Sequence, residues 1–316
     1  MSLIHNHLCY SCRPISYLSA LSKALGVSEE QLRKLALIAD TQYRLADAVE
    51  KPDGSIRQTF DAYTPLKEVH LQIKNEILTR VTFPDYLTGS LKGKDYKMNA
   101  ALHSGAKIVI SEDISNFFPS TTTKIVFDIW RFFFGFSNEV ADCLTRLTTK
   151  DDGLPQGAIT SSYLANLAFW RDEPRVHAHF ARQGVTYSRY VDDMTLSSRR
   201  FITADEKTSV ISTVYGMLAS KGYKAKRQKH KLQTSKDQMF VTKLLVNDRP
   251  ALVRKERAAI RAAVFQLEKQ MCSADSRLLT KEYHRIFGRV SKLARFHKKQ
   301  GEELMQRLQV LRPLIK

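Results

Sequence analysis

The fold is decided by residues 186–197, which read Thr-Tyr-Ser-Arg-Tyr-Val-Asp-Asp-Met-Thr-Leu-Ser. Side chains that favour strands lead into and out of two adjacent carboxylates, Asp192 and Asp193. This pattern predicts a β-hairpin with both acids at its tip. Neighbouring carboxylates repel each other, so the fold gains from the pair only when a cation binds between them. Most bare Asp-Asp pairs are solvated turns, and a third acid placed to join this pair favours a metal site instead.

Such an acid lies upstream, in residues 107–120, which read Lys-Ile-Val-Ile-Ser-Glu-Asp-Ile-Ser-Asn-Phe-Phe-Pro-Ser. Asp113 follows a short apolar strand and comes just before an aromatic pair. Between this segment and the hairpin, residues 154–158 read Leu-Pro-Gln-Gly-Ala, a turn that leads into a helix beginning near residue 160. The two carboxylate motifs therefore follow segments that are typical of strands, whereas residues 154–158 follow a polar connector.

The order of these motifs resembles that of reverse transcriptases, and among them the bacterial retron type. Residues 190–193 resemble the Tyr-x-Asp-Asp box, residues 113–118 the first catalytic segment, and residues 154–158 the Leu-Pro-Gln-Gly box. The resemblance covers roughly residues 50–300. It implies an α+β fold of the right-hand polymerase type, with fingers, an antiparallel palm sheet and a helical thumb.

The resemblance also divides the chain. We expect N-terminal helices and fingers in residues 1–106, the palm with part of the fingers in residues 107–249, and the helical thumb in residues 250–316. Helical spacing of apolar residues follows a capping box at Ser28–Gln31. The same spacing predicts helices over residues 65–77, 123–135 and 204–221, and in two segments of the thumb.

The chemistry that the family performs needs carboxylates. Extension of a nucleic acid is an in-line displacement at the α-phosphorus, and two Mg²⁺ ions activate the 3′-hydroxyl and neutralise the leaving pyrophosphate. Mg²⁺ prefers carboxylate, phosphate and water oxygens. We expect Asp113 and Asp192 to bridge both ions and Asp193 to fill the remaining position or to orient a ligand.

Four further residues are candidates for binding the incoming dNTP: Arg57, Phe118, Gln156 and Lys229. The resemblance implies that Arg57 and Lys229 contact its phosphates and that Gln156 contacts its sugar or phosphate. A ring at Phe118 would leave no room for a 2′-hydroxyl and so favour dNTPs. Two alternatives stay open, since Arg57 also fits a surface position on an edge strand and Phe118 also fits the core.

Six residues are candidates for contacts to RNA or DNA: Asn99, His103, Lys226, Arg227, Thr242 and Lys243. Residues 99–103 read Asn-Ala-Ala-Leu-His and match an Asn-Ala-x-x-His element typical of retron enzymes. Residues 241–243 read Val-Thr-Lys, whereas retron enzymes typically have Val-Thr-Gly. If that Gly serves a turn with positive φ, Lys243 replaces it only with strain.

The distribution of charge supports a polyanionic partner. The chain has 316 residues and a formal net charge of +18, and residues 207–316 contain 26 Lys and Arg against 8 Asp and Glu. The whole excess therefore lies in the last third, next to the carboxylate motif. This one-sidedness favours a nucleic acid held through its phosphates over a basic surface that merely aids solubility.

The sequence also indicates in which cellular compartment the protein is expected. No run of 18 apolar residues is present and the N-terminus has no basic-then-apolar signal pattern, so we expect a cytoplasmic protein without a membrane partner. Four cysteines in a chain of this length do not form a disulfide framework. His5, His7, Cys9 and Cys12 have the chemistry of zinc ligands, but structural zinc sites usually join distant segments.

The predicted function is that of an RNA-directed DNA polymerase of retron type. Such enzymes copy a cognate structured non-coding RNA from an internal 2′-hydroxyl of that RNA. The product is branched RNA–DNA, called multicopy single-stranded DNA (msDNA), and the family commonly pairs it with an effector protein in anti-phage defence. Two alternatives stay open: another bacterial reverse transcriptase (intron, diversity-generating or abortive-infection type), or a nucleic-acid-binding scaffold that has lost catalysis.

Overall fold

The computed structural model describes residues 7–50, 54, 56–270 and 276–312. Its centre is a four-stranded antiparallel sheet with the strand order β6-β7-β5-β8. The strands are β5 (Ile108–Asp113), β6 (Val185–Tyr190), β7 (Asp193–Ser198) and β8 (Lys231–Thr234). The predicted hairpin is confirmed as β6 and β7, which are joined by the two-residue turn Val191–Asp192.

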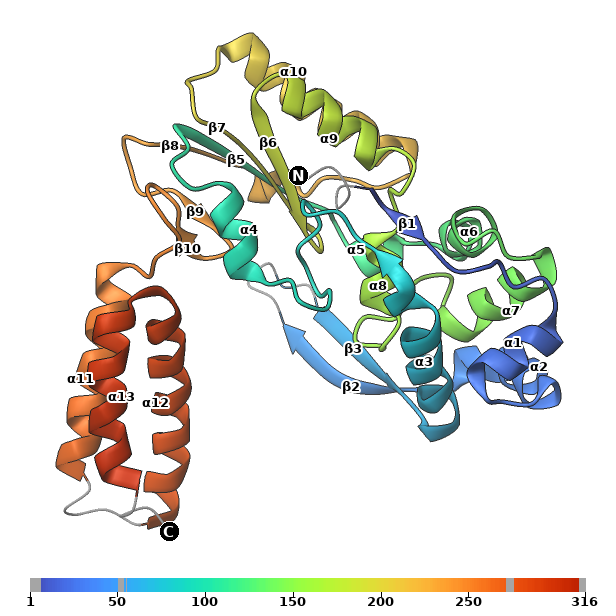
Figure 1. Cartoon of the computed structure of the whole chain (residues 1–316), viewed down its shortest axis with the longest axis horizontal. Helices are drawn as coiled ribbons and strands as arrows, with labels where there is room; N and C mark the ends of the chain where they lie inside the picture. Colours follow the sequence, from blue (N-terminus) through green and yellow to red (C-terminus); the bar gives the residue numbers. More distant parts are fainter. Residues whose placement is uncertain (1–6, 51–53, 55, 271–275, 313–316) are drawn as a thin grey trace.

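Helices cover the two faces of this sheet differently. One face packs against α9 (Glu173–Arg182) and α10 (Ala204–Ser220) (Figure 1). The other face meets the short helix α4 (Tyr96–Leu102) and is otherwise turned toward the cleft described below. Because successive side chains of a strand alternate between faces, Asp113 and Asp193 share the cleft face while Glu112 and Arg189 point beneath the helices.

The N-terminal part forms a helical lobe and a long hairpin. The hairpin consists of β2 (Tyr43–Glu50) and β3 (Ile56–Ala62), and a short pair joins β1 (Cys9–Tyr10) to β4 (Val81–Thr82). The helices are α1 (Leu18–Leu25), α2 (Glu29–Ile38), η1 (Ala39–Thr41), α3 (Thr64–Glu76) and η2 (Leu78–Arg80). The capping box that opens α2 is confirmed, with the Ser28 and Gln31 side chains bonded to each other's backbone N–H groups.

The segment between β5 and β6 is helical. It contains α5 (Phe117–Ser120), α6 (Thr123–Asp128), a π-helical turn (Ile129–Phe133), α7 (Asn138–Thr148) and α8 (Ser161–Asn166). The helix predicted over residues 123–135 is thus α6 followed by the π-helical turn. Trp130 and Phe134 of this segment are buried, as its apolar composition predicts.

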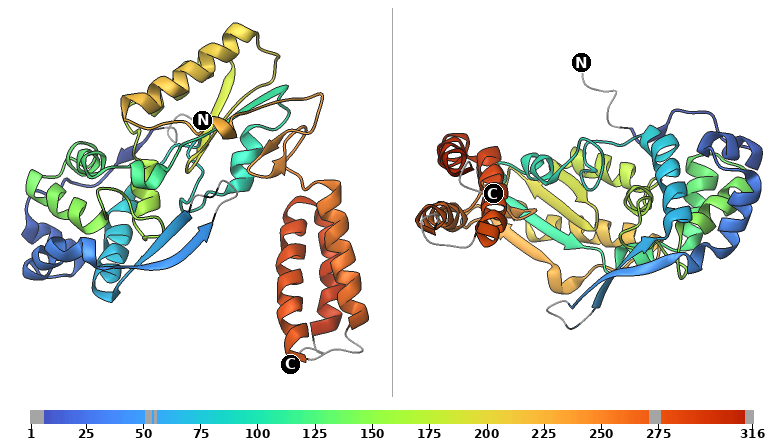
Figure 2. Two further views of the ribbon diagram at one scale, coloured as in Figure 1. Left: turned by 180° about the vertical axis from the view of Figure 1, so that it is seen from behind. Right: turned by 90° about the horizontal axis from the view of Figure 1, so that it is seen from below.

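The C-terminal part is a three-helix bundle formed by α11 (Arg254–Gln270), α12 (Ser276–Phe296) and α13 (Lys298–Leu311). Figures 1 and 2 show the bundle at one end of the molecule, opposite the group formed by α1, α2 and α7. Its core continues into the hairpin of β9 (Phe240–Val241) and β10 (Leu244–Leu245) and reaches Ala100 of α4. The bundle therefore connects to the sheet through this hairpin and α4.

The predicted α+β class is confirmed. A mixed set of helices surrounds an antiparallel sheet, and a purely helical unit follows it in the chain. Within the described part of the chain, no helix is long and apolar enough to cross a bilayer.

Candidate active site

Three carboxylates meet at one end of the central sheet. Asp113 is the last residue of β5 and lies opposite Asp193, the first residue of β7. Asp192 occupies the turn between β6 and β7, and its carbonyl accepts a hydrogen bond of 3.0 Å from the Ile114 amide. Two antiparallel strands and one tight turn thus bring together acids that are far apart in the sequence.

The proximity of these acids changes their titration. Removal from bulk water, reinforced by the charge of Asp113, raises the pKa of Asp192. Desolvation, the charge of Asp192 and contact with Asp113 together raise the pKa of Asp193 to about 7. Asp193 remains exposed to solvent. A bound cation would offset the repulsion from Asp192 and Asp113 that helps to raise its pKa.

The donor chemistry of this cluster fits Mg²⁺, which takes carboxylate oxygens. In the described residues, however, no three His, Cys, Asp or Glu side chains are already arranged around a common point as a metal site. The Lys229 ammonium instead lies 2.5 Å from Asp113 Oδ2 and provides the cation for that carboxylate. The acids are gathered, and Lys229 would have to release Asp113 before a metal ion could bind that carboxylate.

Lys229 reaches Asp113 because its loop is tied to the end of β5. The Lys226 amide donates to the Asp113 carbonyl at 2.7 Å, and the Ser115 amide donates to the Lys224 carbonyl at 2.8 Å. Lys226 and Lys229 both line the cleft, whereas Arg227 between them is exposed to solvent. Two of the three basic residues predicted in this segment are thus placed beside the carboxylates.

A buried ion pair supports the catalytic turn from beneath. Arg189 and Glu173 are both fully buried, and the guanidinium donates to the two carboxylate oxygens at 2.6 and 2.7 Å. Arg189 also donates to the carbonyls of Val191 and Asn166, each at 3.0 Å, and Tyr187 donates to Glu173 at 2.6 Å. The pair therefore connects α9 directly to the turn that presents Asp192. Removal of one partner from such a pair typically costs about 3–5 kcal/mol.

The backbone of the catalytic turn is also constrained from the side. Val191 has φ +62, an unusual value for a β-branched residue. A Cβ at Gly89 would lie 2.3 Å from the Val191 amide nitrogen, so only glycine permits this close approach. Sequence reasoning missed Arg189, Glu173 and Gly89. The one available signal was a charged Arg189 inside an otherwise uncharged strand.

The carboxylates open onto a cleft of about 870 Å³ between the sheet and the β2–β3 hairpin. Arg57 of β3 points to Gln156, whose amide oxygen accepts from the guanidinium at 2.7 and 2.9 Å when it faces these donors. The Phe60 amide donates to the Gln156 carbonyl at 2.7 Å. Gly157 has φ +106, and a Cβ there would lie 2.8 Å from the Phe60 carbonyl oxygen. Arg57 and Gln156, predicted separately, are therefore one unit within the cleft.

The aromatic pair after Asp113 is split between two environments. Phe117 is buried and packs against Phe169 and Tyr223. Phe118 is only partly buried and lines the cleft with Asn116, which adopts φ +46. The alternative that both rings lie in the core thus describes Phe117 fully and Phe118 in part, since Phe118 also packs against the core.

Asn99 and His103 lie inside the protein, which corrects the prediction that they contact nucleic acid. Both are buried, and Asn99 Oδ1 accepts from the hydroxyls of Thr88 (2.8 Å) and Ser188 (2.7 Å). His103 contacts Ser188 through Nε2 and Ser197 through Nδ1, each at 2.7 Å. Since Ser188 donates to Asn99, it accepts from a protonated Nε2, and Ser197 donates to Nδ1. Burial lowers the pKa of His103 to about 3, so the ring is neutral.

Thr242 and Lys243 form the two-residue turn between β9 and β10. Their φ values are +47 and +65, and the Thr242 hydroxyl donates to the Tyr96 carbonyl at 2.9 Å. Lys243 therefore occupies the left-handed conformation that the expected Gly would adopt freely. The Lys243 side chain is exposed, whereas the Thr242 side chain is hydrogen-bonded to the first residue of α4.

Of the four N-terminal candidates for a zinc site, His7, Cys9 and Cys12 are described, and they are not part of any group that could hold a metal ion. His5 lies outside the described residues. Cys9 and Cys12 are exposed free thiols.

The fold and the site define a class. A sheet that presents three acids beneath a long hairpin, followed by a helical bundle, is the arrangement of a right-hand nucleic-acid polymerase. Residues 4–243 match the family described as reverse transcriptase (RNA-dependent DNA polymerase). The chain belongs to this family, and its activity is RNA-directed DNA polymerisation.

Similar curated proteins include reverse transcriptases of the retron type. The retron Se72 reverse transcriptase of Salmonella heidelberg (strain 579083-10) is 35% identical over 95% of this chain and 81% of its own length. The retron Ec48 reverse transcriptase of Escherichia coli is 32% identical over 95% of this chain and 77% of its own length. The predicted resemblance to retron enzymes is thereby confirmed. Telomerase from Candida albicans, solved with a fragment of telomeric RNA, aligns with a TM-score of 0.39 and 8% identity over 63% of this chain and 40% of that chain.

Proposed function

We propose that this chain copies a cognate structured non-coding RNA from an internal 2′-hydroxyl of that RNA and so makes branched msDNA. The observation that carries the proposal is the cleft, where three carboxylates face the Arg57–Gln156 unit and Lys229. The similarity to two retron enzymes over 95% of the chain supports the choice of product. We further propose that the product acts with an effector protein in anti-phage defence, which rests on the resemblance alone.

In this proposal Asp113, Asp192 and Asp193 hold two Mg²⁺ ions, which supply an activated 3′-hydroxyl and a neutralised pyrophosphate. Lys229 exchanges its bond to Asp113 for a phosphate of the dNTP. Arg57 contacts the same phosphates, Gln156 contacts the sugar or phosphate, and Phe118 excludes a 2′-hydroxyl.

Contacts to the template and primer are proposed for the exposed or cleft-lining members of the basic segments. These are Lys226, Arg227 and Lys243, with Thr242 fixing the turn that carries Lys243. Binding through phosphates predicts that affinity falls steeply as salt rises, with little direct reading of sequence.

The test is to express the chain with its native flanking locus and to separate small nucleic acids on a denaturing gel. Treatment with RNase and with a debranching enzyme should each shift the DNA band. A DNA band that is indifferent to debranching would contradict priming from a 2′-hydroxyl and would assign the chain to another class of reverse transcriptase.

Catalysis is tested with two matched variants. Asp192→Asn should lower incorporation of dNTPs on a primed RNA template by about 10³-fold or more, because it removes a metal ligand. Asp151→Asn changes an exposed acid that lines the same cleft and has φ +49, a conformation that Asn tolerates. We expect that control to retain its activity. Normal incorporation by Asp192→Asn would overturn the assignment of Asp192 as a metal ligand, whereas no incorporation by the unaltered chain on any RNA template would revive the scaffold alternative.

A further inference from the structure

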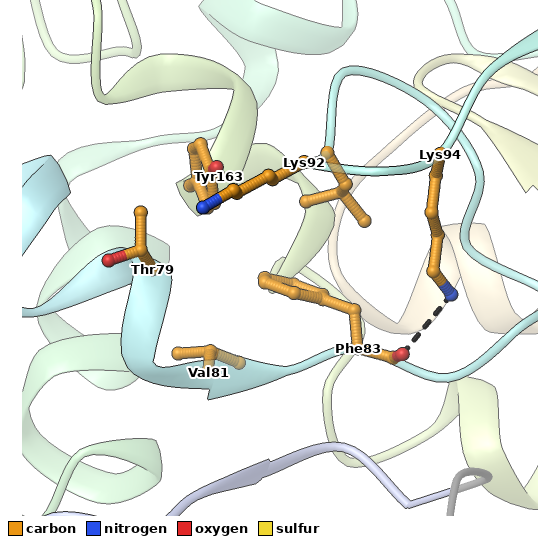
Figure 3. Close-up of a pocket in the computed structure, with 7 residues that line it drawn as sticks. Thr79, Val81, Phe83, Lys92, Lys94 and Tyr163 are labelled. Atoms are coloured by element: carbon orange, nitrogen blue, oxygen red, sulfur yellow. Dashed lines mark hydrogen bonds between the residues drawn. The ribbon is translucent and has the colours of Figure 1, made fainter.

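A second, smaller hollow of about 260 Å³ lies next to the catalytic cleft (Figure 3). Its walls are Val81, Phe83, Leu91 and Tyr163, and the exposed Lys92 also lines it. The catalytic mechanism uses none of these residues. The volume is below the range of sites for drug-sized ligands and suits a single heterocyclic base.

The walls are aromatic and aliphatic, with Phe83 partly exposed and Tyr163 nearly buried. The rings of Phe83 and Tyr163 pack edge to face, with centroids 6.0 Å apart and an interplanar angle of 64°. Val81 and Leu91 are buried aliphatic neighbours. Stacking of a base on an aromatic side chain contributes about 1–3 kcal/mol and tolerates any base.

The two lysines at the pocket differ in their roles. Lys94 is partly buried and donates to the carbonyls of Phe83 (3.2 Å) and Pro84 (2.5 Å), so it fixes the loop that forms the wall. Lys92 is exposed, extends across the pocket toward Tyr163 in Figure 3, and has no ion-pair partner among the residues that the structure describes. Lys92 is therefore available for an anion that reaches the pocket.

The pocket shares a wall with the cleft. Ser90 and Ser162 line the cleft, and the residues that directly follow them, Leu91 and Tyr163, line the pocket. A nucleic-acid strand that leaves the cleft over this wall meets the pocket next. A paired base cannot enter it, whereas an unpaired base is free to turn away from its neighbours.

We propose that this pocket binds one unpaired nucleotide of the RNA strand, with its base against Phe83 and Tyr163 and its phosphate at Lys92. The inference rests on the RNA-directed activity and not on the branched product. It gives the enzyme a contact to single-stranded template outside the duplex that is being extended.

The test uses the full chain and a short single-stranded RNA that carries 4-thiouridine. Irradiation should crosslink the RNA to a peptide that contains Phe83 or Tyr163. Lys92→Glu should weaken binding of the RNA about tenfold and reduce this crosslink, because it places a like charge beside the phosphate. Lys34→Glu makes the same charge change at an exposed position of α2 and should alter binding less than about twofold.

Three results would overturn the proposal. They are crosslinks confined to residues of the catalytic cleft, equal binding by Lys92→Glu and Lys34→Glu, and loss of the crosslink in a large excess of dNTPs, which would assign the pocket to free nucleotides. Extension of a DNA primer on an RNA template is measured in parallel. A crosslink at the pocket without branched product in cells would support this inference and contradict the proposed retron function.

Discussion

Phe117 and Phe118 are adjacent in the sequence but have different surroundings. The ring of Phe117 is buried among core aromatics, whereas Phe118 is partly buried, lines the cleft and also packs against the core. A short helix, α5, causes this separation because consecutive side chains of a helix point about 100° apart. Substitution at Phe118 therefore tests a role in the cleft while it leaves the buried ring of Phe117 in place.

We expect Phe118→Ala to raise the acceptance of rNTPs relative to dNTPs by roughly 10- to 100-fold, because the space for a 2′-hydroxyl is no longer blocked. The measurement is a competition between the two nucleotides on a primed RNA template. Phe60→Ala removes another ring from the same cleft and should leave the ratio unchanged. An unchanged ratio in Phe118→Ala would count against the gate.

Lys243 adopts a positive φ, which is unfavourable for a residue that carries a Cβ atom. Both positions of the β9–β10 turn have positive φ, as a two-residue turn between antiparallel strands favours, and glycine adopts this conformation most freely.

Lys243→Gly should therefore raise the free energy of unfolding by up to about 1 kcal/mol, measured by urea denaturation. Lys243→Ala removes the same charge but keeps the Cβ, so it should bring no such gain. Equal stabilisation by both variants would show that charge repulsion, rather than backbone strain, sets the cost.

At the scale of elements, α4 is joined to the catalytic hairpin by buried polar side chains. His103 links α4 to both strands through Ser188 on β6 and Ser197 on β7. These bonds require a neutral ring, which burial ensures. The retron-type Asn-Ala-x-x-His element thus positions the hairpin from within the protein.

This arrangement predicts a dependence of stability on pH. The pKa of His103 is about 3 in the folded protein, below the value near 6.5 of an exposed histidine, so the unfolded chain binds more protons as pH falls. The contribution is complete above about pH 6.5 and is lost progressively toward pH 3. Between pH 7 and pH 5 the loss should be about 2 kcal/mol.

The measurement compares urea unfolding of the wild type and of His103→Gln across this range. Gln retains a donor and an acceptor but does not titrate, so its stability should fall less steeply toward acid. Parallel pH profiles for the two proteins would show that His103 is not the group responsible.

At the scale of the whole molecule, the helical bundle is attached to the rest of the chain at the start of α4. Arg295 pairs with Asp95 at 2.6 Å and lies over the Tyr96 ring, and Lys97 donates to the Arg295 carbonyl at 3.0 Å. Asp95 also caps α4 by accepting from the Met98 amide. One short helix therefore sets the positions of both the bundle and the catalytic hairpin.

If the bundle holds the template–primer duplex and not the dNTP, we expect Arg295→Ala to weaken template–primer binding about three- to tenfold, with little change in the KM for dNTP. Asp95→Asn removes the ion pair with Arg295, while Asn can still cap α4. If the ion pair matters because it attaches the bundle, this variant should also bind the template–primer more weakly. Charge alone would make that variant bind more tightly. Tighter binding by Asp95→Asn would falsify a role for the attachment.

The sequence by itself determined the fold class and the three catalytic candidates. Strand patterning around Asp192 and Asp193, the strand before Asp113 and the order of the motifs are local properties that a chain displays before it folds. The same holds for the capping box at Ser28 and for the basic last third.

Only the tertiary structure decided which polar residues face the cleft. Asn99 and His103 have a polar pattern that fits a surface, yet packing of α4 against β6 and β7 buries them. The Arg189–Glu173 pair and the wall shared by cleft and pocket join segments that are distant in the chain. Side-chain periodicity specifies a face of an element, but the partner of that face depends on long-range packing, which is why these features could not be read from the sequence.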